Sequence, residues 1–459
     1  MARSDFDVVV VGAGTSGANA AYQFARRGRR VLLVERRAGH AGGAQWHNGV
    51  LDRHFVQAGL EPPSGPERVA ERVTVHLRST DPRLGPTLAE GPSVAADMAL
   101  LGQRLRTLAA DAGAELIDEV ASMDVGVEPA SGRICSVTLR RDDGSEPTTV
   151  TGSLFVDASG RGGALRRHAR DLDPWCPTLQ ADELCSASDA HHHVADPAGA
   201  EAFVERHGAR PGEAVTFVGV SGGFSTCAVT VSADLTQVGI LVGCLANGRY
   251  GTGPQMVADF CRREPWVGEV ISMGSGVIPL RRPYARVTAP GLALVGDAAC
   301  QVFPAHGSGI GTGLVAGTML AEGVASLDHP GDPNELWRRY QAPFQRTLGG
   351  DLAGFDTLRR TSTRLGSAGV DALMRAGLIN EHTAHAALDQ RWAVPPRAAA
   401  VRNAARLARH PRLAAVMVPT LARAQALHVH AARHPEHLDV DALARWERRT
   451  ARLVGPLPS

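Results

Sequence analysis

Hydrophobic and polar positions change their period twice within the first 36 residues. Val8 to Val11 form an unbroken β-branched run, which is typical of a parallel strand buried on both faces. A helical pattern follows from Ala18 to Arg27, and a second apolar run covers Val31 to Val34. The pattern predicts a strand, a helix and a second parallel strand.

Three glycines at GxGxxG spacing, Gly12, Gly14 and Gly17, connect the first strand to the helix. The first makes a tight turn, the second lets the backbone approach a pyrophosphate, and the third lets helix and strand pack closely. The N-terminus of the helix offers unpaired N–H groups to phosphates. Glu35, at the end of the second strand, can accept hydrogen bonds from ribose hydroxyls, whereas a 2′-phosphate would meet a like charge. The unit predicts a site for FAD or NAD rather than NADP, and a tight turn without a ligand is the alternative.

The middle of the chain predicts further strands and a change of domain. Residues 93–113 have apolar positions at helical spacing. Strands are expected at Glu115 to Val120, Ile134 to Leu139 and Thr148 to Phe155, and a hairpin turn at Asp142 to Ser145 joins the last two. Short β-rich runs separated by turn residues in 176–270 predict an antiparallel sheet that forms a separate domain.

Two later strands end in an acid followed by glycines. The first leads into Asp157 and Gly160, and the second, Gly291 to Asp297, leads through a loop into Gly307, Gly309 and Gly311. An acid at a strand end can accept hydrogen bonds from sugar hydroxyls, and the glycine run lets a helix N-terminus touch a ligand. Residues 334–459 have a helical pattern rich in alanine, arginine and leucine. We expect structural helices or an interface there.

Composition narrows these possibilities. The chain has 459 residues and a net charge of +1, so nothing favours nucleic acid as a partner. Seven scattered cysteines without a CxxC pair are typical of a cytoplasmic protein with reduced thiols. No apolar run is long enough for a transmembrane segment, and the first strand begins too early to leave room for a signal peptide.

Histidines raise the question of a metal. His191, His192 and His193 are consecutive, and neighbours on a strand point to opposite faces, so they cannot all serve one site and we expect no metal. His47 follows a glycine-rich loop at 42–49 close to the expected cofactor. It is either a flavin attachment point or an ordinary hydrogen-bonding residue, and we favour the second.

Three separated motifs now stand in order: GAGTSG with Glu35, VDASGRGG, and GLALVGDAACQVFPAHGSGIGTGLVAG. Together they resemble the FAD-dependent oxidoreductases of the para-hydroxybenzoate-hydroxylase-like fold. The segment VIPLRRP before the third motif is similar to the arrangement in the geranylgeranyl reductase family. The resemblance covers roughly residues 5–345 in outline.

The resemblance implies a set of FAD contacts spread over the three motifs. The implied cofactor-binding residues are Gly12, Gly14, Gly17, Glu35, Arg36, Asp157, Gly160, Gly296, Asp297, Pro304, Gly307, Gly309, Ile310 and Gly311. The glycines of the first motif would hold the pyrophosphate, Asp297 the ribityl chain or pyrophosphate, and Pro304 would lie against the ring. Two departures stand out: Met98 occupies the place of a family arginine, and Gly223 to Thr226 replace a motif typical of many prenyl reductases.

His306 is the candidate catalytic residue. It is the titratable group in the loop expected to contact the flavin ring, and a neutral imidazole there could pass a proton to or from a substrate. The alternative is a histidine that only hydrogen-bonds backbone.

These patterns predict an α/β fold with a Rossmann-like FAD-binding domain (1–175 and 271–345), an inserted antiparallel β-sheet substrate domain (176–270) and a helical C-terminal region (346–459). The expected activity is C=C reduction of an apolar or polycyclic small molecule, isoprenoid-like or a secondary metabolite, with NAD(P)H as a transient donor. A flavin monooxygenase (hydroxylase or epoxidase) and a non-redox cyclase or binding protein with structural FAD are the alternatives. The C-terminal helices could form a homo-oligomer.

Overall fold

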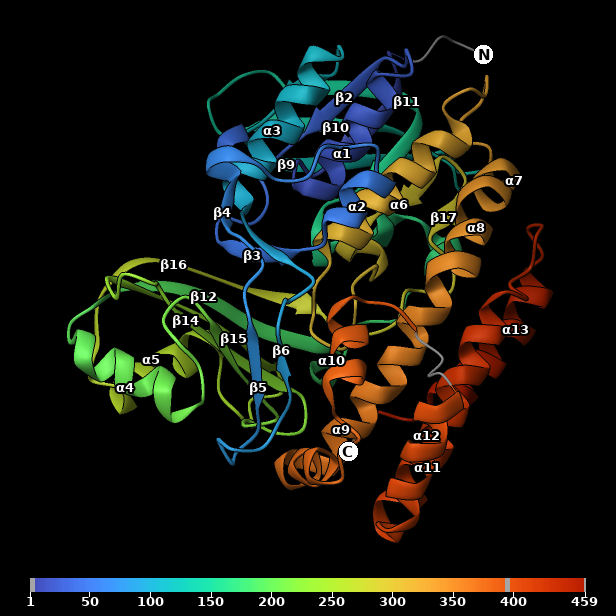
Figure 1. Ribbon diagram of the computed structural model, residues 1–459. Coiled ribbons are helices and arrows are strands. Elements are labelled where there is room, and N and C mark those ends of the chain that lie inside the picture. Colours follow the sequence, from blue (N-terminus) through green and yellow to red (C-terminus); the bar gives the residue numbers. More distant parts are fainter. Residues whose placement is uncertain (1–4, 393–396, 458–459) are drawn as a thin grey trace.

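The computed structural model describes residues 5–392 and 397–457. Figure 1 shows one sheet with its helices at the top, a second sheet at the lower left and the C-terminal helices along the right. In this view the first sheet lies above the second sheet, and the C-terminal helices lie to its right.

The upper sheet is built on five parallel strands in the order β18-β11-β1-β2-β8. Its strands are β1 (Phe6–Val11), β2 (Val31–Val34), β8 (Glu115–Ile117), β9 (Val120–Val127), β10 (Ile134–Arg141), β11 (Thr148–Asp157), β17 (Thr288–Ala289) and β18 (Leu292–Leu294). The packed helices are α1 (Thr15–Ala25), α3 (Met98–Asp111) and α6 (Ile310–Val324), with α2 (Asp52–Gln57) against α6. Val8, Val9 and Val10 are fully buried, which confirms the predicted parallel strand. The Rossmann-like α/β fold is confirmed.

Register brings the predicted motifs to one edge of this sheet. Val11 pairs with Val34 on one side and with Asp157 on the other, and Asp157 pairs with Leu294. The carboxyl ends of parallel strands meet at the same edge, which is where ligands bind in such sheets. The turns after β1, β2, β11 and β18 therefore share one edge.

The lower sheet has seven strands in the order β16-β12-β15-β14-β13-β5-β6. Their bounds are β16 (Val267–Pro279), β12 (Leu184–Val194), β15 (Gln237–Leu245), β14 (Ser225–Val231), β13 (Ala214–Val218), β5 (Val75–Arg78) and β6 (Thr87–Leu88). All neighbours are antiparallel except β5 and β13. Strands β5 and β6 come from segment 1–175, which was predicted to belong to the FAD-binding domain. Helices α4 (Pro197–Arg206) and α5 (Gly253–Arg263) pack on one face, and we call the opposite face the inner face.

A third, small sheet lies between the two larger ones in space (Figure 1). It consists of β3 (His47–Val50), β7 (Val94–Asp97) and β4 (Arg68–Ala70), in the order β3-β7-β4. Trp46, just before β3, lies against the lower sheet, because a Cβ at Gly274 would be 2.8 Å from its ring. This short sheet therefore connects the upper sheet to the lower sheet.

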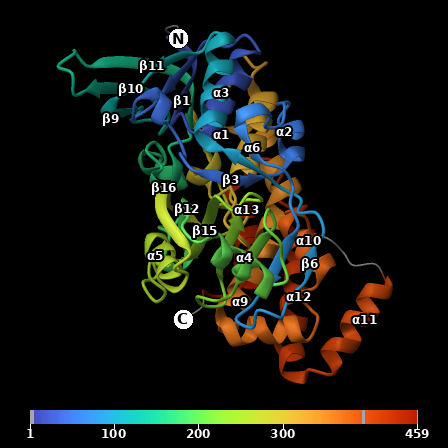
Figure 2. The same cartoon turned by 60° about the vertical axis from the view of Figure 1, so that its left-hand side comes forward.

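The C-terminal region is helical, as predicted. Its helices are α7 (Pro333–Leu336), α8 (Ala342–Phe344), α9 (Gly350–Arg375), α10 (Glu381–Leu388), α11 (Arg397–Ala408), α12 (Pro411–Ala431) and α13 (Val440–Val454). Helix α9 packs against α12 and α13. Figure 2 shows α11 projecting at the opposite end of the molecule from the hairpin of β10 and β11. In the described part of the chain, no helix is long and apolar enough to span a membrane.

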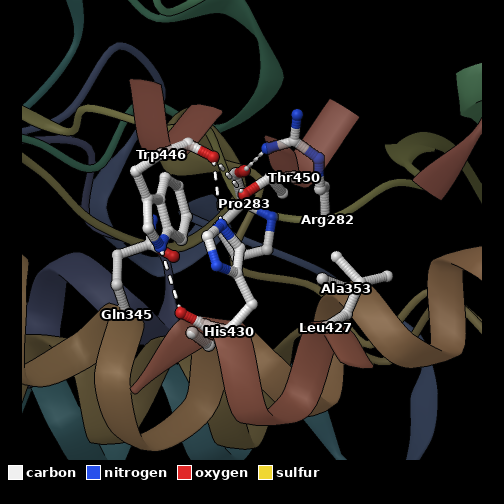
Figure 3. A pocket seen from close by; sticks show the side chains of 10 residues that line it. Arg282, Pro283, Gln345, Ala353, Leu427, His430, Trp446 and Thr450 are labelled. Atoms are coloured by element: carbon white, nitrogen blue, oxygen red, sulfur yellow. Dashed lines mark hydrogen bonds between the residues drawn. The ribbon is translucent and has the colours of Figure 1, made fainter. Parts of the chain in front are cut away.

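A small cavity lies among α9, α12 and α13 (Figure 3). His430 and Trp446 close it with two reciprocal hydrogen bonds of 3.1 and 3.2 Å, and their rings stack. Its volume of about 10 Å³ suits a single water and not a substrate. We therefore place the functional site elsewhere.

Candidate functional site

The turn after β1 can be built only with glycine. Gly12 has φ +106°, and a Cβ there would lie 2.4 Å from the carbonyl oxygen of Ala158. A Cβ at Gly17 would lie 1.9 Å from the carbonyl oxygen of Gly12. Helix α1 starts behind Gly14, which provides no capping side chain. The N–H groups of its first turn therefore face a cradle that suits a phosphate.

Glu35 is 7% exposed at the end of β2. One carboxylate oxygen accepts a hydrogen bond of 2.8 Å from the Ala13 N–H, and the other accepts one of 3.0 Å from the Arg37 N–H. Each oxygen keeps acceptor capacity for a ribose hydroxyl. Arg36 is exposed beside it. Arg106 of α3, which was not predicted as a site residue, donates 3.2 Å hydrogen bonds to the carbonyls of Ala13 and Gly42 and so fixes the loop.

Asp157 is fully buried and its acceptors are occupied by the protein. It accepts hydrogen bonds from the backbone and hydroxyl of Ser159, at 3.1 and 2.6 Å. It also accepts 2.8 Å hydrogen bonds from the N–H groups of Leu165 and Arg166. Asp157 therefore folds the turn against Gly12. Gly160 has φ +73° and open space around it.

Asp297 is the opposite case. It lies in the 3₁₀ turn Gly296–Ala299 after β18, and its carboxylate accepts no hydrogen bond from any described residue. Burial raises its pKa to about 6. A half-buried carboxylate without a partner is costly, and a hydroxyl donor from a ligand removes that cost. The donor set fits the sugar hydroxyls of a ribityl chain or ribose.

Two helix N-termini and this turn converge on Ser16. A Cβ at Gly296 would lie 2.7 Å from the Ser16 hydroxyl, and one at Gly313 would lie 2.1 Å from it. Gly309 precedes α6 and provides no capping side chain for it. It also lies close to Asp297, because a Cβ at Gly309 would be 3.2 Å from Asp297 Oδ1. Two positive helix ends beside one carboxylate favour an anionic ligand with hydroxyls. These residues fit FAD.

The loop expected to contact the flavin ring is packed from both sides. Pro304 is buried, and Ile310 begins α6. Gly307 has φ +79°, and a Cβ there would be 2.8 Å from Ile278 of β16. A Cβ at Gly311 would be 1.8 Å from His54 Nδ1. The loop is thus held between the lower sheet and α2.

His306 lies in this loop with its ring centroid 4.8 Å from that of Phe303. Burial lowers its pKa to about 4, although a hydrogen bond with the backbone of Ala387 works in the other direction. Its Nε2 is buried and has no hydrogen-bond partner among the described residues. At neutral pH the imidazole is therefore uncharged, with one nitrogen left for a ligand or a water.

The C-terminal helices cover the loop, which the sequence did not predict. The backbone of Ala387 in α10 contacts His306, and Asp389 just after α10 forms an ion pair of 3.2 Å with Arg53. Arg53 lies next to His54, whose pKa burial and this arginine lower to about 4. No local pattern could have found this arrangement, because it joins residues more than 300 positions apart.

The inner face of the lower sheet carries a half-exposed group of small and apolar side chains, with Asp189 and His191 on the same face of β12. Register places Ala187, Thr226, Ala228 and Leu241 together on it, and each is partly accessible. Ile278, which pairs with Cys185 of the same face, contacts the His306 loop at Gly307. A second cavity, of about 260 Å³, opens on the other face beside α4 and α5, away from this loop. The inner face is therefore the surface that adjoins the candidate flavin site.

Fold and site together define an FAD-dependent oxidoreductase, and comparison with known proteins agrees. Residues 7–168 match the family described as FAD dependent oxidoreductase. This part of the chain is therefore that of an FAD-dependent oxidoreductase, and the chain as a whole is similar to proteins named as geranylgeranyl reductases.

Several relatives align with this chain over most of their length. The digeranylgeranylglycerophospholipid reductase of Sulfolobus acidocaldarius is 24% identical over 394 residues, which cover 83% of this chain and 82% of that protein. The menaquinone reductase of Mycolicibacterium smegmatis is 29% identical over 337 residues, 70% of this chain and 76% of that protein. The crystal structure of a geranylgeranyl bacteriochlorophyll reductase-like protein from Thermoplasma acidophilum has a TM-score of 0.69 and 17% identity, covering 92% of this chain and 99% of that one.

Proposed function

We propose that this protein reduces a C=C bond of an apolar, isoprenoid-like small molecule that lies on the inner face of the lower sheet. The observation that carries the proposal is this face, with its small and apolar side chains ending at the His306 loop. An extended apolar chain gains free energy by leaving water for such a surface. The names of the relatives agree with a prenyl substrate.

In this reaction the residues of the protein bind the cofactor and donate one proton. The glycines of the β1 turn, Glu35 and Asp297 would hold FAD, which supplies hydride transfer when bound. Reduction of C=C adds a hydride to one carbon and a proton to the other. We propose that His306 passes this proton to the substrate from Nε2, the nitrogen without a protein partner, and regains one from water that enters when the product leaves. Burial makes its protonated form a stronger acid than an ordinary imidazolium.

We propose NADPH or NADH as the electron donor, bound transiently near the flavin. The sequence has no second GxGxxG unit that would form a separate nicotinamide site. An anaerobic absorbance spectrum tests this part: the flavin band should bleach after NADPH or NADH is added. A band that stays oxidised with both, and also with substrate present, would contradict this donor.

The reaction is tested with dithionite-reduced enzyme and geranylgeranyl diphosphate under argon. The expected result is reoxidation of the flavin and a product heavier by two hydrogen atoms for each bond reduced. A product that gains oxygen after air is admitted would indicate the monooxygenase instead. Turnover by enzyme whose flavin is never reduced would indicate the non-redox alternative.

A further inference from the structure

Three metal-ligating side chains meet where β3 reaches the lower sheet. His47 begins β3, whereas Asp189 and His191 lie two residues apart on β12 and so share its inner face. Each offers one ligand atom, and these atoms all lie within 4.8 Å of one another. Figure 1 shows β3 at the junction between the upper and lower sheets. The cluster therefore joins two parts of the fold.

The contacts within the cluster are close. The backbone N–H of His47 donates a 3.1 Å hydrogen bond to Asp189 Oδ2, and His191 Nε2 lies 3.2 Å from the same oxygen. The two imidazole ring centroids are 4.3 Å apart. Asp189 is 6% exposed. A buried carboxylate with two imidazoles is a donor set that borderline divalent ions prefer.

One imidazole nitrogen in the cluster has no protein partner. His47 Nδ1 is buried, and no described residue hydrogen-bonds to it. Its other nitrogen, Nε2, is 3.7 Å from Asp97 Oδ2, and Asp97 is itself fixed by hydrogen bonds from the first turn of α3. A ligating histidine commonly turns its second nitrogen to a carboxylate. Asp97 stands in that place for His47.

Glycines in the adjacent strands make room for the cluster. Gly239 of β15 pairs with His191, and a Cβ there would be 3.1 Å from the His191 ring. Gly274 of β16 pairs with Asp189, and a Cβ there would push Trp46 and the start of β3 away. Larger residues at either position would prevent the three side chains from meeting.

We propose that His47, Asp189 and His191 bind one divalent transition-metal ion, with Zn²⁺ as the best match to two nitrogens and one oxygen. Three protein ligands leave a fourth position for water or a substrate oxygen. The ion would tie the loop before β3 to strand β12 of the lower sheet. This inference does not depend on the proposed reductase activity.

The three consecutive histidines do not form one site. Strand alternation sends His192 to the other face, where its Nδ1 is 3.0 Å from the carbonyl of Gly268, and His193 is exposed. The expectation of no metal rested on these three residues taken together. The proposed site uses His191 alone of these three, with two residues from outside the run.

Zinc binding to the FAD-loaded protein tests the proposal. Protein is dialysed against EDTA, titrated with ZnCl₂ in a calorimeter, and analysed for bound zinc after gel filtration. We expect one Zn²⁺ per chain. His191→Gln and Asp189→Asn should each weaken binding by more than about tenfold. Zinc should raise the Tm of the unaltered protein and of neither variant.

The matched control is His193→Ala, on the same strand but outside the cluster. It should bind zinc as the unaltered protein does, and all variants should keep their ratio of FAD to protein. The proposal fails if the unaltered protein binds no more zinc than a His47→Ala/His191→Gln double variant. It also fails if His193→Ala loses binding equally, which would mean adventitious surface binding.

Discussion

At the scale of single residues, Asp157 and Asp297 show how similar signals can have different outcomes. Asp157 ends β11 and Asp297 lies in the turn after β18, so both are at the same edge of the sheet. The first uses its acceptors on the protein's own N–H groups, and the second has no described partner. The sequence predicted both as cofactor ligands, since it shows the acid and the glycines but not where the following turn folds. Asp297 keeps the stronger case for binding FAD.

Replacement of Asp297 should separate cofactor binding from stability. Asp297→Ala should purify without FAD, because the hydroxyl acceptor is gone. In FAD-free protein at pH 8, Asp297→Asn should raise the free energy of unfolding by about 1 to 3 kcal/mol. The sign follows from the raised pKa of about 6: this carboxyl adds stability below about pH 4 and loses it as the pH rises through 6. Urea unfolding at pH 5 and pH 8 measures this, and a fully yellow Asp297→Ala protein would contradict the binding role.

His306→Ala should keep FAD and slow turnover about 10²- to 10⁴-fold, the usual contribution of a positioned acid or base. Because the pKa of His306 is about 4, its protonated fraction grows about tenfold for each pH unit below 8. Turnover of the unaltered enzyme should therefore rise as the pH falls from 8 to 6, and the variant should lose this slope. Steady-state rates over that range are the measurement. If turnover depends on pH in the same way in both proteins, His306 has only a structural role.

At the scale of elements, the site depends on how closely α6 approaches its neighbours. Gly311→Ala should lose FAD and stability, because the new Cβ would lie 1.8 Å from His54 Nδ1. Adding His54→Gly removes that clash and should restore part of both. Gly162→Ala is the control, since a Cβ there meets open space. Melting temperature and FAD content report the result, and a Gly311→Ala protein as stable as the control would contradict this packing.

Elements with a strong local period were predictable, and those without one were not. The β1-α1-β2 unit, the β10–β11 hairpin and the C-terminal helices follow the sequence because burial imposes their pattern. The β-rich runs that predicted the sheet in 176–270 correspond to β13, β14 and β15. Strands β12 and β16 have no such run, since polar residues in β12 and glycines in β16 break the alternation of inner and outer positions. The Arg53–Asp389 pair depends on tertiary folding alone.

At the scale of the whole molecule, a buried ionic network ties α9 to the lower sheet. Asp356 is fully buried between Arg359 and Arg360, and Arg360 also reaches Glu183 just before β12, at 3.3 Å. Burial alone would raise the pKa of Asp356, yet the two guanidinium groups lower it to about 2. The carboxylate thus stays charged throughout the physiological range and compensates two buried cations.

Asp356→Asn should destabilise the protein by about 3 to 5 kcal/mol, because it leaves buried guanidinium groups without their counter-charge. The loss should be seen at pH 7, since the stabilisation from a lowered pKa is present above about pH 4 and disappears only as the pH falls towards 2. Urea unfolding at pH 7 measures it. Glu335→Gln is the control, a partly exposed acid that pairs with Arg338 and Arg339 at the surface and should change stability by less than about 1 kcal/mol. Equal effects would contradict the network's role.

Oligomerisation through the C-terminal helices stays a prediction, and exposed apolar residues on α12 give it a definite test. Val418 is 53% exposed, Leu421 41% and Val429 49%, and their spacing places them along one side of the helix. Such a stripe is typical of a helix that packs against a second copy. Light scattering should give the mass of a dimer, and Val418→Lys with Leu421→Lys should give that of a monomer with its FAD content unchanged. Val56→Lys, at an exposed valine on α2, is the control that should remain dimeric. A monomeric unaltered protein would overturn the prediction and leave the stripe as ordinary exposed surface.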